Sequence, residues 1–225
     1  MAITTSNMQR SVKVGTGTTH SFNYTATAST SILIVLINLR DGADPPTSIS
    51  VTYNSVALTL VTGTNAVNAT SDQAMGFYYM LNPPTGSSYS LAASWTLTSS
   101  CILSAVCLLG TTGSPFGGTN ISNVSTNSHN KTITTIADDM CFDAVFTNSG
   151  SSFTEGAGQT VLFTQATANS DMTSEGSYEI ATGTSTVMSY TIGSSVNTGY
   201  AAFAVRADSG GGGGPIYDGK FFQLF

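Results

Sequence analysis

The chain has 225 residues and a formal net charge of −6, and only 8% of its residues are charged, against roughly 25% in an average soluble protein. Phosphate binding needs clustered Lys and Arg, so the six scattered basic residues argue against nucleic acid and against an anionic membrane surface. The polar surface must come mainly from Ser, Thr, Asn and Gly. These residues favour strands and turns over helices, which predicts an all-β chain.

The start of the chain contains no apolar stretch typical of a signal peptide. The longest apolar run, residues 32–39, is far shorter than the ~20 residues of a membrane-spanning helix. We therefore expect a protein that is made in the cytoplasm and is not inserted into a membrane.

Short segments with strand-like patterns follow one another along the chain. Residues 32–39 and 101–109 are continuous apolar runs, typical of central strands covered on both faces. Residues 49–60 and 187–192 alternate between apolar and polar side chains, as half-buried strands do. Residues 72–81 have a weak helical pattern, but Gly76 and the paired tyrosines favour a strand.

The strand spacing and the turn signals predict an antiparallel β-sandwich, of the jelly-roll or concanavalin-like kind, over residues 1–209. Residues 140–146 add another alternating strand, with Asp143 on the face opposite the apolar residues. Residues 111–130 are rich in Gly, Ser and Asn, and we interpret them as one long surface loop. A division of the chain into two lobes at this point is the alternative.

The three cysteines are predicted to be reduced and buried. Cys101 and Cys107 lie on the same face of one predicted strand, about 20 Å apart, which is too far for a disulfide. Cys141 could pair with one of them only from an adjacent strand. Neither a CxxC motif nor a Cys/His cluster suited to zinc occurs in the sequence.

Residues 210–214 form a glycine linker, and residues 215–225 form an apolar segment that we expect to be a docking arm. Such a segment must be buried, either on its own domain or on a partner. We expect partner binding by its large apolar residues, Ile216, Tyr217, Phe221, Phe222, Leu224 and Phe225.

No catalytic constellation is recognisable. His20 and His129 have no sequence-level nucleophile partner and are interpreted as surface residues. Glu175 and Glu179 could share one strand face as a glycosidase pair, but a solvated strand edge is the preferred interpretation. We expect no catalytic, cofactor or metal site.

Acidic pairs and aromatic residues leave two alternatives open. The pairs Asp41 with Asp44, Asp138 with Asp139, and Asp171 with Glu175 could bind calcium, but turn formation explains them better. The aromatic residues Tyr78, Tyr79 and Trp95 could stack on a sugar, although we place Trp95 in the core.

Four segments, residues 51–61, 76–95, 101–117 and 176–207, resemble a β-sandwich module that recurs in bacteriophage virion proteins and bacterial surface proteins. The chain departs from that pattern at Ser55, where Gly is common in the hairpin turn. The resemblance implies a structural or adhesive module without a shared catalytic motif. We therefore expect a non-enzymatic virion protein (a capsid decoration, a head fibre or a tail-associated component) whose partners are other virion proteins and copies of itself. The alternative is a module that binds a host-surface glycan.

Overall fold

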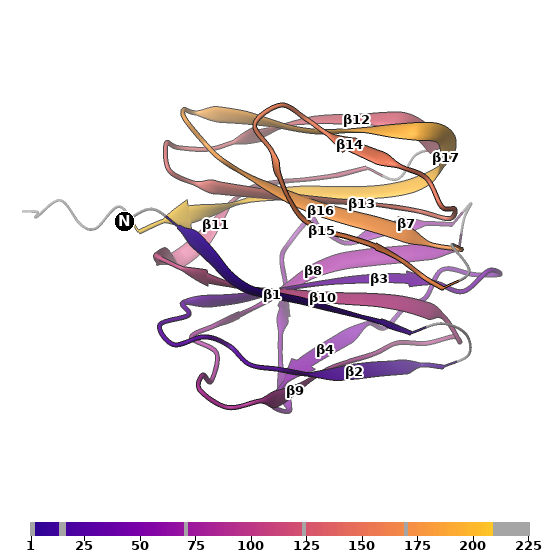
Figure 1. The fold of residues 1–225 in the computed structure, drawn as a ribbon, viewed down its shortest axis with the longest axis horizontal. Coiled ribbons are helices and arrows are strands. Elements are labelled where there is room, and N and C mark those ends of the chain that lie inside the picture. Colours follow the sequence, from indigo (N-terminus) through magenta and orange to yellow (C-terminus); the bar gives the residue numbers. More distant parts are fainter. Residues whose placement is uncertain (1–2, 14–16, 70–71, 123–124, 169–170, 209–225) are drawn as a thin grey trace, which may run out of the picture.

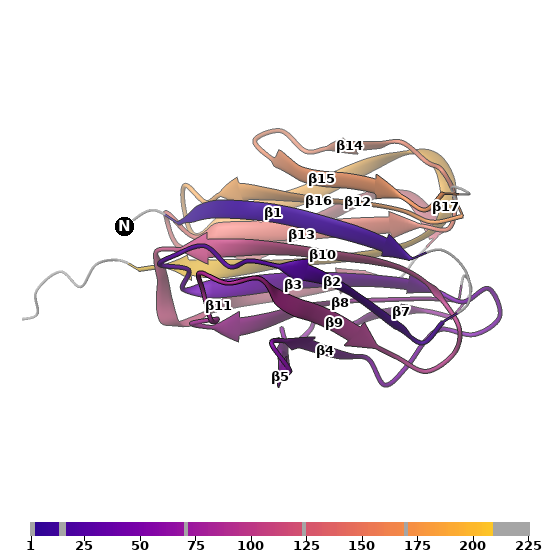
Figure 2. The ribbon, with the colours of Figure 1, turned by 60° about the horizontal axis from the view of Figure 1, so that its bottom comes forward.

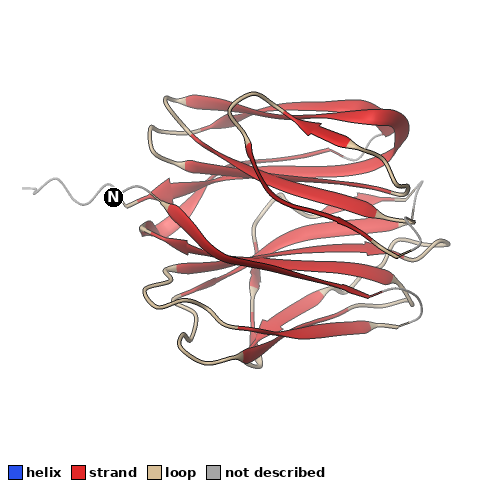
Figure 3. Ribbon diagram, in the orientation of Figure 1, coloured by secondary structure: helices blue, strands red, loops and turns tan. Residues whose placement is uncertain are grey.

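The computed structural model describes residues 3–13, 17–69, 72–122, 125–168 and 171–208. Every regular element in this part of the chain is a β-strand, and no described residue is helical (Figure 3). The neighbouring strands of the sheets pair in the antiparallel sense. The predicted all-β antiparallel sandwich is therefore confirmed. Among these residues there is no helix that could cross a membrane.

The chain forms its strands in two consecutive groups. The first group is β1 (Thr4–Lys13), β2 (Thr19–Tyr24), β3 (Ile32–Arg40), β4 (Ser50–Tyr53), β5 (Val56–Ala57), β6 (Thr59–Leu60), β7 (Ala66–Asn68), β8 (Gln73–Leu81), β9 (Tyr89–Ser94) and β10 (Ser100–Leu109). The second group is β11 (Thr111–Ser122), β12 (Ser125–Thr134), β13 (Met140–Thr147), β14 (Phe153–Glu155), β15 (Thr160–Ala166), β16 (Thr173–Ile180) and β17 (Ser185–Ala207).

These strands form four stacked layers, which Figure 1 shows from bottom to top. The N-outer sheet is β2-β9-β4-β5, and the N-inner sheet is β1-β10-β3-β8-β6 with β7 beside β8. The C-inner sheet is β11-β17-β13-β16-β15, and the C-outer sheet consists of β12, β14 and the first part of β17. The long strand β17 joins the two C-terminal sheets, because residues 185–197 pair in the outer one and residues 198–207 in the inner one.

Three apolar cores separate the four layers. We call them the N-core, between the two N-terminal sheets, the central core, between the two inner sheets, and the C-core, between the two C-terminal sheets. Successive side chains of a strand point to opposite faces, so each inner strand serves two cores. In β3, Ile34 enters the central core and Val35 the N-core, and in β13, Phe142 enters the central core and Cys141 the C-core. The continuous apolar runs predicted as doubly covered strands are therefore β3 and β10.

The two halves of the chain share one topology. The order β1-β10-β3-β8-β6 is matched by β11-β17-β13-β16-β15, and the order β2-β9-β4 by β12-β17-β14. The inner sheets stack with β1 near β15 and β8 near β11, since Arg10 bonds to Gln165 and Tyr79 contacts Phe116. The halves are therefore two sandwiches placed back to back (Figures 1 and 2). The matching strand orders and these contacts relate them by an approximate twofold axis parallel to the strands.

The prediction of one long surface loop over residues 111–130 is wrong. This segment contains β11 and the first half of β12, and the division between the halves lies at Gly110, which has a φ of 81°. Both strands lie at sheet edges. An edge strand needs few apolar residues because one flank has no strand neighbour, so a segment rich in Ser, Thr and Asn suffices there.

The hairpin between β4 and β5 accommodates Ser55 in a turn where Gly is common. Asn54 and Ser55 have φ values of 51° and 63°. Two consecutive central residues in the left-handed region define a type I′ turn, which matches the right-handed twist of the flanking strands. Asn tolerates this region well, and the hydroxymethyl side chain of Ser is small enough to follow it.

We expect Gly199→Ala to destabilise the fold. Gly199 pairs with Phe146 across β17 and β13, and a Cβ at this position would lie 2.0 Å from the buried ring. Overpacking of this kind typically costs about 1–3 kcal/mol. Urea denaturation followed by fluorescence measures the change. The matched control is Gly183→Ala, where no atom lies within 4 Å of the added Cβ, and equal stability of the two variants would contradict this account.

Candidate functional site

A buried polar cluster inside the described fold surrounds Asp143, in the middle of β13. Its carboxylate accepts three hydrogen bonds: from Ser177 Oγ at 2.5 Å, from Tyr200 OH at 3.0 Å and from Gln159 Nε2 at 3.1 Å. Ser177 is the direct neighbour of Asp143 on β16, and Tyr200 lies on β17. Three segments of the C-terminal sandwich therefore meet at one carboxylate.

Burial controls the ionisation of Asp143. The side chain is enclosed between the two C-terminal sheets, and the loss of hydration raises its pKa to about 7. The three hydrogen bonds oppose this shift, and the charge of Glu175 adds to it. The predicted strand over residues 140–146 already had Asp143 among apolar residues. Its partners Gln159, Ser177 and Tyr200 carried no recognisable signal in the sequence.

Glu175 and Glu179 lie on the same face of β16, but they do not form a glycosidase pair. Four residues along a strand span about 13 Å, beyond the ~5–9.5 Å that separates such carboxylates. Glu175 is 5% exposed and accepts a hydrogen bond from Thr164 Oγ1 at 2.6 Å. Burial raises the pKa of both carboxyls. The interpretation of a solvated strand edge is wrong for Glu175, because β16 runs between β13 and β15.

The prediction that His129 is a surface residue is also wrong. Its ring is 4% exposed, stacks on Tyr200 with centroids 4.8 Å apart, and lies 2.9 Å from Thr198 Oγ1 through Nε2. Burial lowers its pKa to about 4, with a smaller contribution from Lys131. Successive side chains of β12 point to opposite faces, and the face that carries His129 is turned toward the C-core. His20 is half-buried, and its Nε2 lies 2.9 Å from Ser11 Oγ.

These groups are built into the sandwich as structural parts. Asp143, Glu175 and His129 are buried between sheets, where a substrate has no access. The described residues contain no group of three His, Cys, Asp or Glu side chains that could hold a metal ion. Asp139, one of the acidic residues considered for calcium, instead accepts a hydrogen bond from the Ile136 amide. It also forms an ion pair with Arg206, with 2.6 Å between Oδ2 and Nη1.

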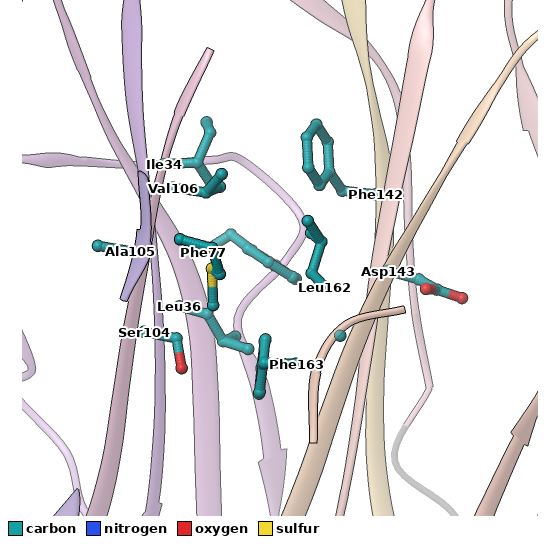
Figure 4. A pocket seen from close by; sticks show the side chains of 12 residues that line it. Ile34, Leu36, Phe77, Ser104, Ala105, Val106, Phe142, Asp143, Leu162 and Phe163 are labelled. Atoms are coloured by element: carbon teal, nitrogen blue, oxygen red, sulfur yellow. The ribbon is translucent and has the colours of Figure 1, made fainter. Parts of the chain in front are cut away.

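An apolar cavity lies between the two inner sheets at the side formed by β1 and β15 (Figure 4). It has about 290 Å³ of empty space, including its open mouth, and it is bordered by residues of both halves: Met8, Ile34, Leu36, Phe77, Ser104, Phe142, Leu162 and Phe163. Met8 and Leu162 reach it from irregular positions where β1 and β15 slip in register, which re-aims the side chains. The carboxylate of Asp143 points away from the cavity (Figure 4).

The cavity is too narrow for an organic ligand. Its interior accommodates about one water molecule. The buried Ser104 hydroxyl at its wall has no protein hydrogen-bond partner, so a water bound in the cavity would supply that hydrogen bond. We interpret this space as a packing defect at the interface between the two sandwiches.

The remaining sequence-predicted residues lie as follows. Trp95 and Tyr78 are buried in the N-core, as expected for Trp95, and Tyr79 is half-buried on the opposite face of β8. The proposed sugar-stacking platform is therefore not formed. The predicted partner-binding residues Ile216, Tyr217, Phe221, Phe222, Leu224 and Phe225 lie outside the described residues.

The three cysteines are unpaired and buried, as predicted. Cys101 and Cys107 point into the N-core from β10, and Cys141 points into the C-core. Burial raises the pKa of the Cys141 thiol to about 11.

A scan against protein-family models finds no match to this chain, and a search of curated proteins finds no similar sequence. Its role must therefore be inferred from its own residues.

We expect Asp143 to make stability depend on pH. The carboxyl has a pKa near 3.8 in the unfolded chain and about 7 in the fold. Below pH 3.8 both states are protonated, and the native state has its full stability. Between pH 4 and 7 the unfolded chain ionises first, so the free energy of unfolding falls, by a few kcal/mol at about 1.4 kcal/mol per pKa unit.

Comparison of wild type with Asp143→Asn isolates this effect. The neutral amide does not titrate, so the difference in unfolding free energy between the two proteins must change between pH 4 and 7 and be flat above pH 8. His129, whose pKa is lowered, works in the opposite direction in both proteins and cancels in the difference. Urea titrations at several pH values measure it, and a constant difference would contradict a protonated Asp143.

We expect the thiols to be unreactive in the native protein. A thiol reagent should label none of the three at neutral pH, because burial hinders access to all of them and, at Cys101 and Cys141, also raises the pKa of the thiol. All three should react once the protein is denatured, as a colorimetric thiol titration measures. Only one reactive thiol after denaturation would indicate a disulfide.

Proposed function

We propose that the protein is a non-enzymatic structural component of a virion, such as a capsid decoration, a head fibre or a tail-associated part, that assembles through protein–protein contacts. The main support is the inward orientation of the groups that could do chemistry. Asp143, Glu175 and His129 are all held between sheets. A fold that holds these two carboxyl groups and this histidine between its sheets is suited to a structural role.

The outer faces of the stack also suit an assembled protein. The outward-facing side chains of both outer sheets are mostly small and uncharged: Thr19, Ser21, Asn23, Ser50, Ser90, Ser94, Ser128, Asn130, Thr132, Val187 and Thr191. Charge repulsion between copies is weak where such faces approach each other. Hydroxyl groups keep these faces hydrated while the protein is free.

The docking arm supplies the contact in this proposal. Residues 210–214 are glycines, and the following segment carries six large apolar side chains, from Ile216 to Phe225. Each such side chain contributes about 1.5–3 kcal/mol when it is buried. The arm can therefore offset the entropy lost when the glycine linker becomes ordered.

The resemblance to phage virion modules supports the same role. The glycan-binding alternative has less support, because Trp95 and Tyr78 are in the core. An enzyme would be indicated by saturable turnover that is lost on changing His20, His129, Glu175 or Glu179.

Deletion of residues 210–225 tests the proposal. We expect the truncated chain to keep its melting temperature, because the three cores described above are built from residues 3–207, and to disappear from purified particles. Sedimentation of particles followed by immunoblotting measures attachment, and circular dichroism measures folding. Full attachment of the truncated chain, or absence of the full-length chain from every particle fraction, would contradict the proposal.

A further inference from the structure

The back-to-back packing of the two sandwiches creates two related margins along the central core. β1 lies near β15 at the first margin, and β6 and β8 lie near β11 at the second. The approximate twofold axis exchanges these margins, because β1 corresponds to β11 and β6 to β15. Any structural difference between the two margins therefore comes from the length and residues of the edge strands.

The first margin is nearly closed. β15 is seven residues long, and its Leu162 and Met8 of β1 both line the cavity described above. Outside them, Arg10 Nε donates a hydrogen bond to Gln165 Oε1 at 2.8 Å. Apolar side chains and a polar bridge thus fill this edge of the central core.

The second margin is open. β6, the counterpart of β15, has only two residues, so the edge of the N-inner sheet ends early. The β6–β11 groove that results has about 580 Å³ of empty space, including its mouth, and is lined by Thr59, Leu60, Val61, Thr62, Tyr79, Phe116 and Gly117. The rings of Tyr79 and Phe116 lie 4.4 Å apart in its wall, and both are only partly buried.

The same sheet edge has a second depression, on the face of the sheet to which Tyr78 points. Leu60 also borders this depression of about 550 Å³, which Ile49, Val67 and Tyr78 line. Val67 is 37% exposed, and the linings of both depressions are uncharged. An apolar, aromatic segment several residues long matches this surface in shape and chemistry.

We propose that the β6–β11 groove receives residues 216–225 of a neighbouring copy. This inference rests on the proposed function, in which these residues form a docking arm. The arm provides four aromatic and two aliphatic side chains for a groove walled by Tyr79, Phe116 and Leu60. The arm is apolar, and the groove presents the rings of Tyr79 and Phe116 beside the hydroxyls of Thr59 and Thr62, so docking removes apolar surface of both from water.

The length of the linker lets the arm reach a groove on a neighbouring copy. β17 ends at Ala207, and Val205 pairs directly with Phe116, so the chain's own groove begins beside the end of its last strand. A short turn would be enough to enter it. Residues 209–215 can extend roughly 23 Å, which suits a groove across a contact between molecules. Two copies that exchange arms then form a closed symmetric pair.

The experiment uses the purified full-length chain in solution. The groove variants are Tyr79→Ser and, at an exposed position that the fold tolerates, Thr59→Glu. The arm variant is Phe221→Ser with Phe222→Ser. The control is Val187→Ser, which removes an exposed apolar side chain, 47% exposed, from the C-outer sheet, away from the groove. Circular dichroism confirms that each variant is folded.

Sedimentation velocity over a range of concentrations gives the expected results. Wild type and the control associate equally. Each groove or arm variant weakens association by roughly tenfold or more, as the loss of a buried aromatic contact does. An equimolar mixture of Tyr79→Ser with the arm variant regains pairing, because one intact groove then meets one intact arm.

Three outcomes would overturn the inference: a wild type that stays monomeric at 100-fold the concentration used for particle binding, variants that associate like wild type, or a mixture that does not regain pairing. Binding of a fluorescent peptide of residues 215–225 to the arm variant, together with a monomeric wild type, would indicate docking within one chain. These measurements need no particles. A chain that pairs through the groove but never attaches to particles would disprove the virion role and leave the groove assignment standing.

Discussion

The packing of the two inner sheets against each other, through the central core, is the contact on which the other layers depend. The ring centroid of Phe203 on β17 lies 4.8 Å from that of Phe77 in the N-inner sheet and 5.6 Å from that of Phe142 in the C-inner sheet. This ring therefore contacts aromatic side chains of both inner sheets. Because the inner strands are covered on both faces, a polar side chain within them needs a partner inside the protein. Asn38 finds one across the interface, where its Nδ2 donates to Ser174 Oγ at 3.0 Å. The outer sheets can cover the remaining faces only because this interface holds the inner ones in place.

The two sandwiches share a topology but fill their own cores differently. The N-core places the Tyr24 hydroxyl 3.0 Å from Cys107 Sγ, and that hydroxyl also donates to the Asn7 carbonyl at 2.8 Å. The C-core instead contains Asp143 with its three donors. A buried polar network tolerates few alternative registers, because a shift of one residue would turn the donors to the other face. We infer that the carboxylate fixes the alignment of β13, β16 and β17, at the cost of a raised pKa.

The same duplicated architecture explains where an interaction surface is available. An exact twofold axis would make both margins of the central core identical. The edge strand β15 has seven residues, however, and its counterpart β6 has only two. The short strand exposes aromatic side chains that its longer counterpart would cover. The outer faces have mostly hydroxyl side chains, whereas the groove at the second margin also presents the rings of Tyr79 and Phe116.

Composition and alternation alone determined the all-β class, the doubly covered strands β3 and β10, the buried thiols and the core position of Trp95. These follow from local chemistry, because the period of two along a strand and the lack of charge do not depend on which strands become neighbours. Only the tertiary structure decided that the chain forms two sandwiches, that residues 111–130 are edge strands, and that His129 and Glu175 are internal. Those features depend on strand order and layer stacking, which bring together residues far apart in the sequence. The sequence pattern around a polar residue is the same whether that face of its strand is covered by water or by another sheet.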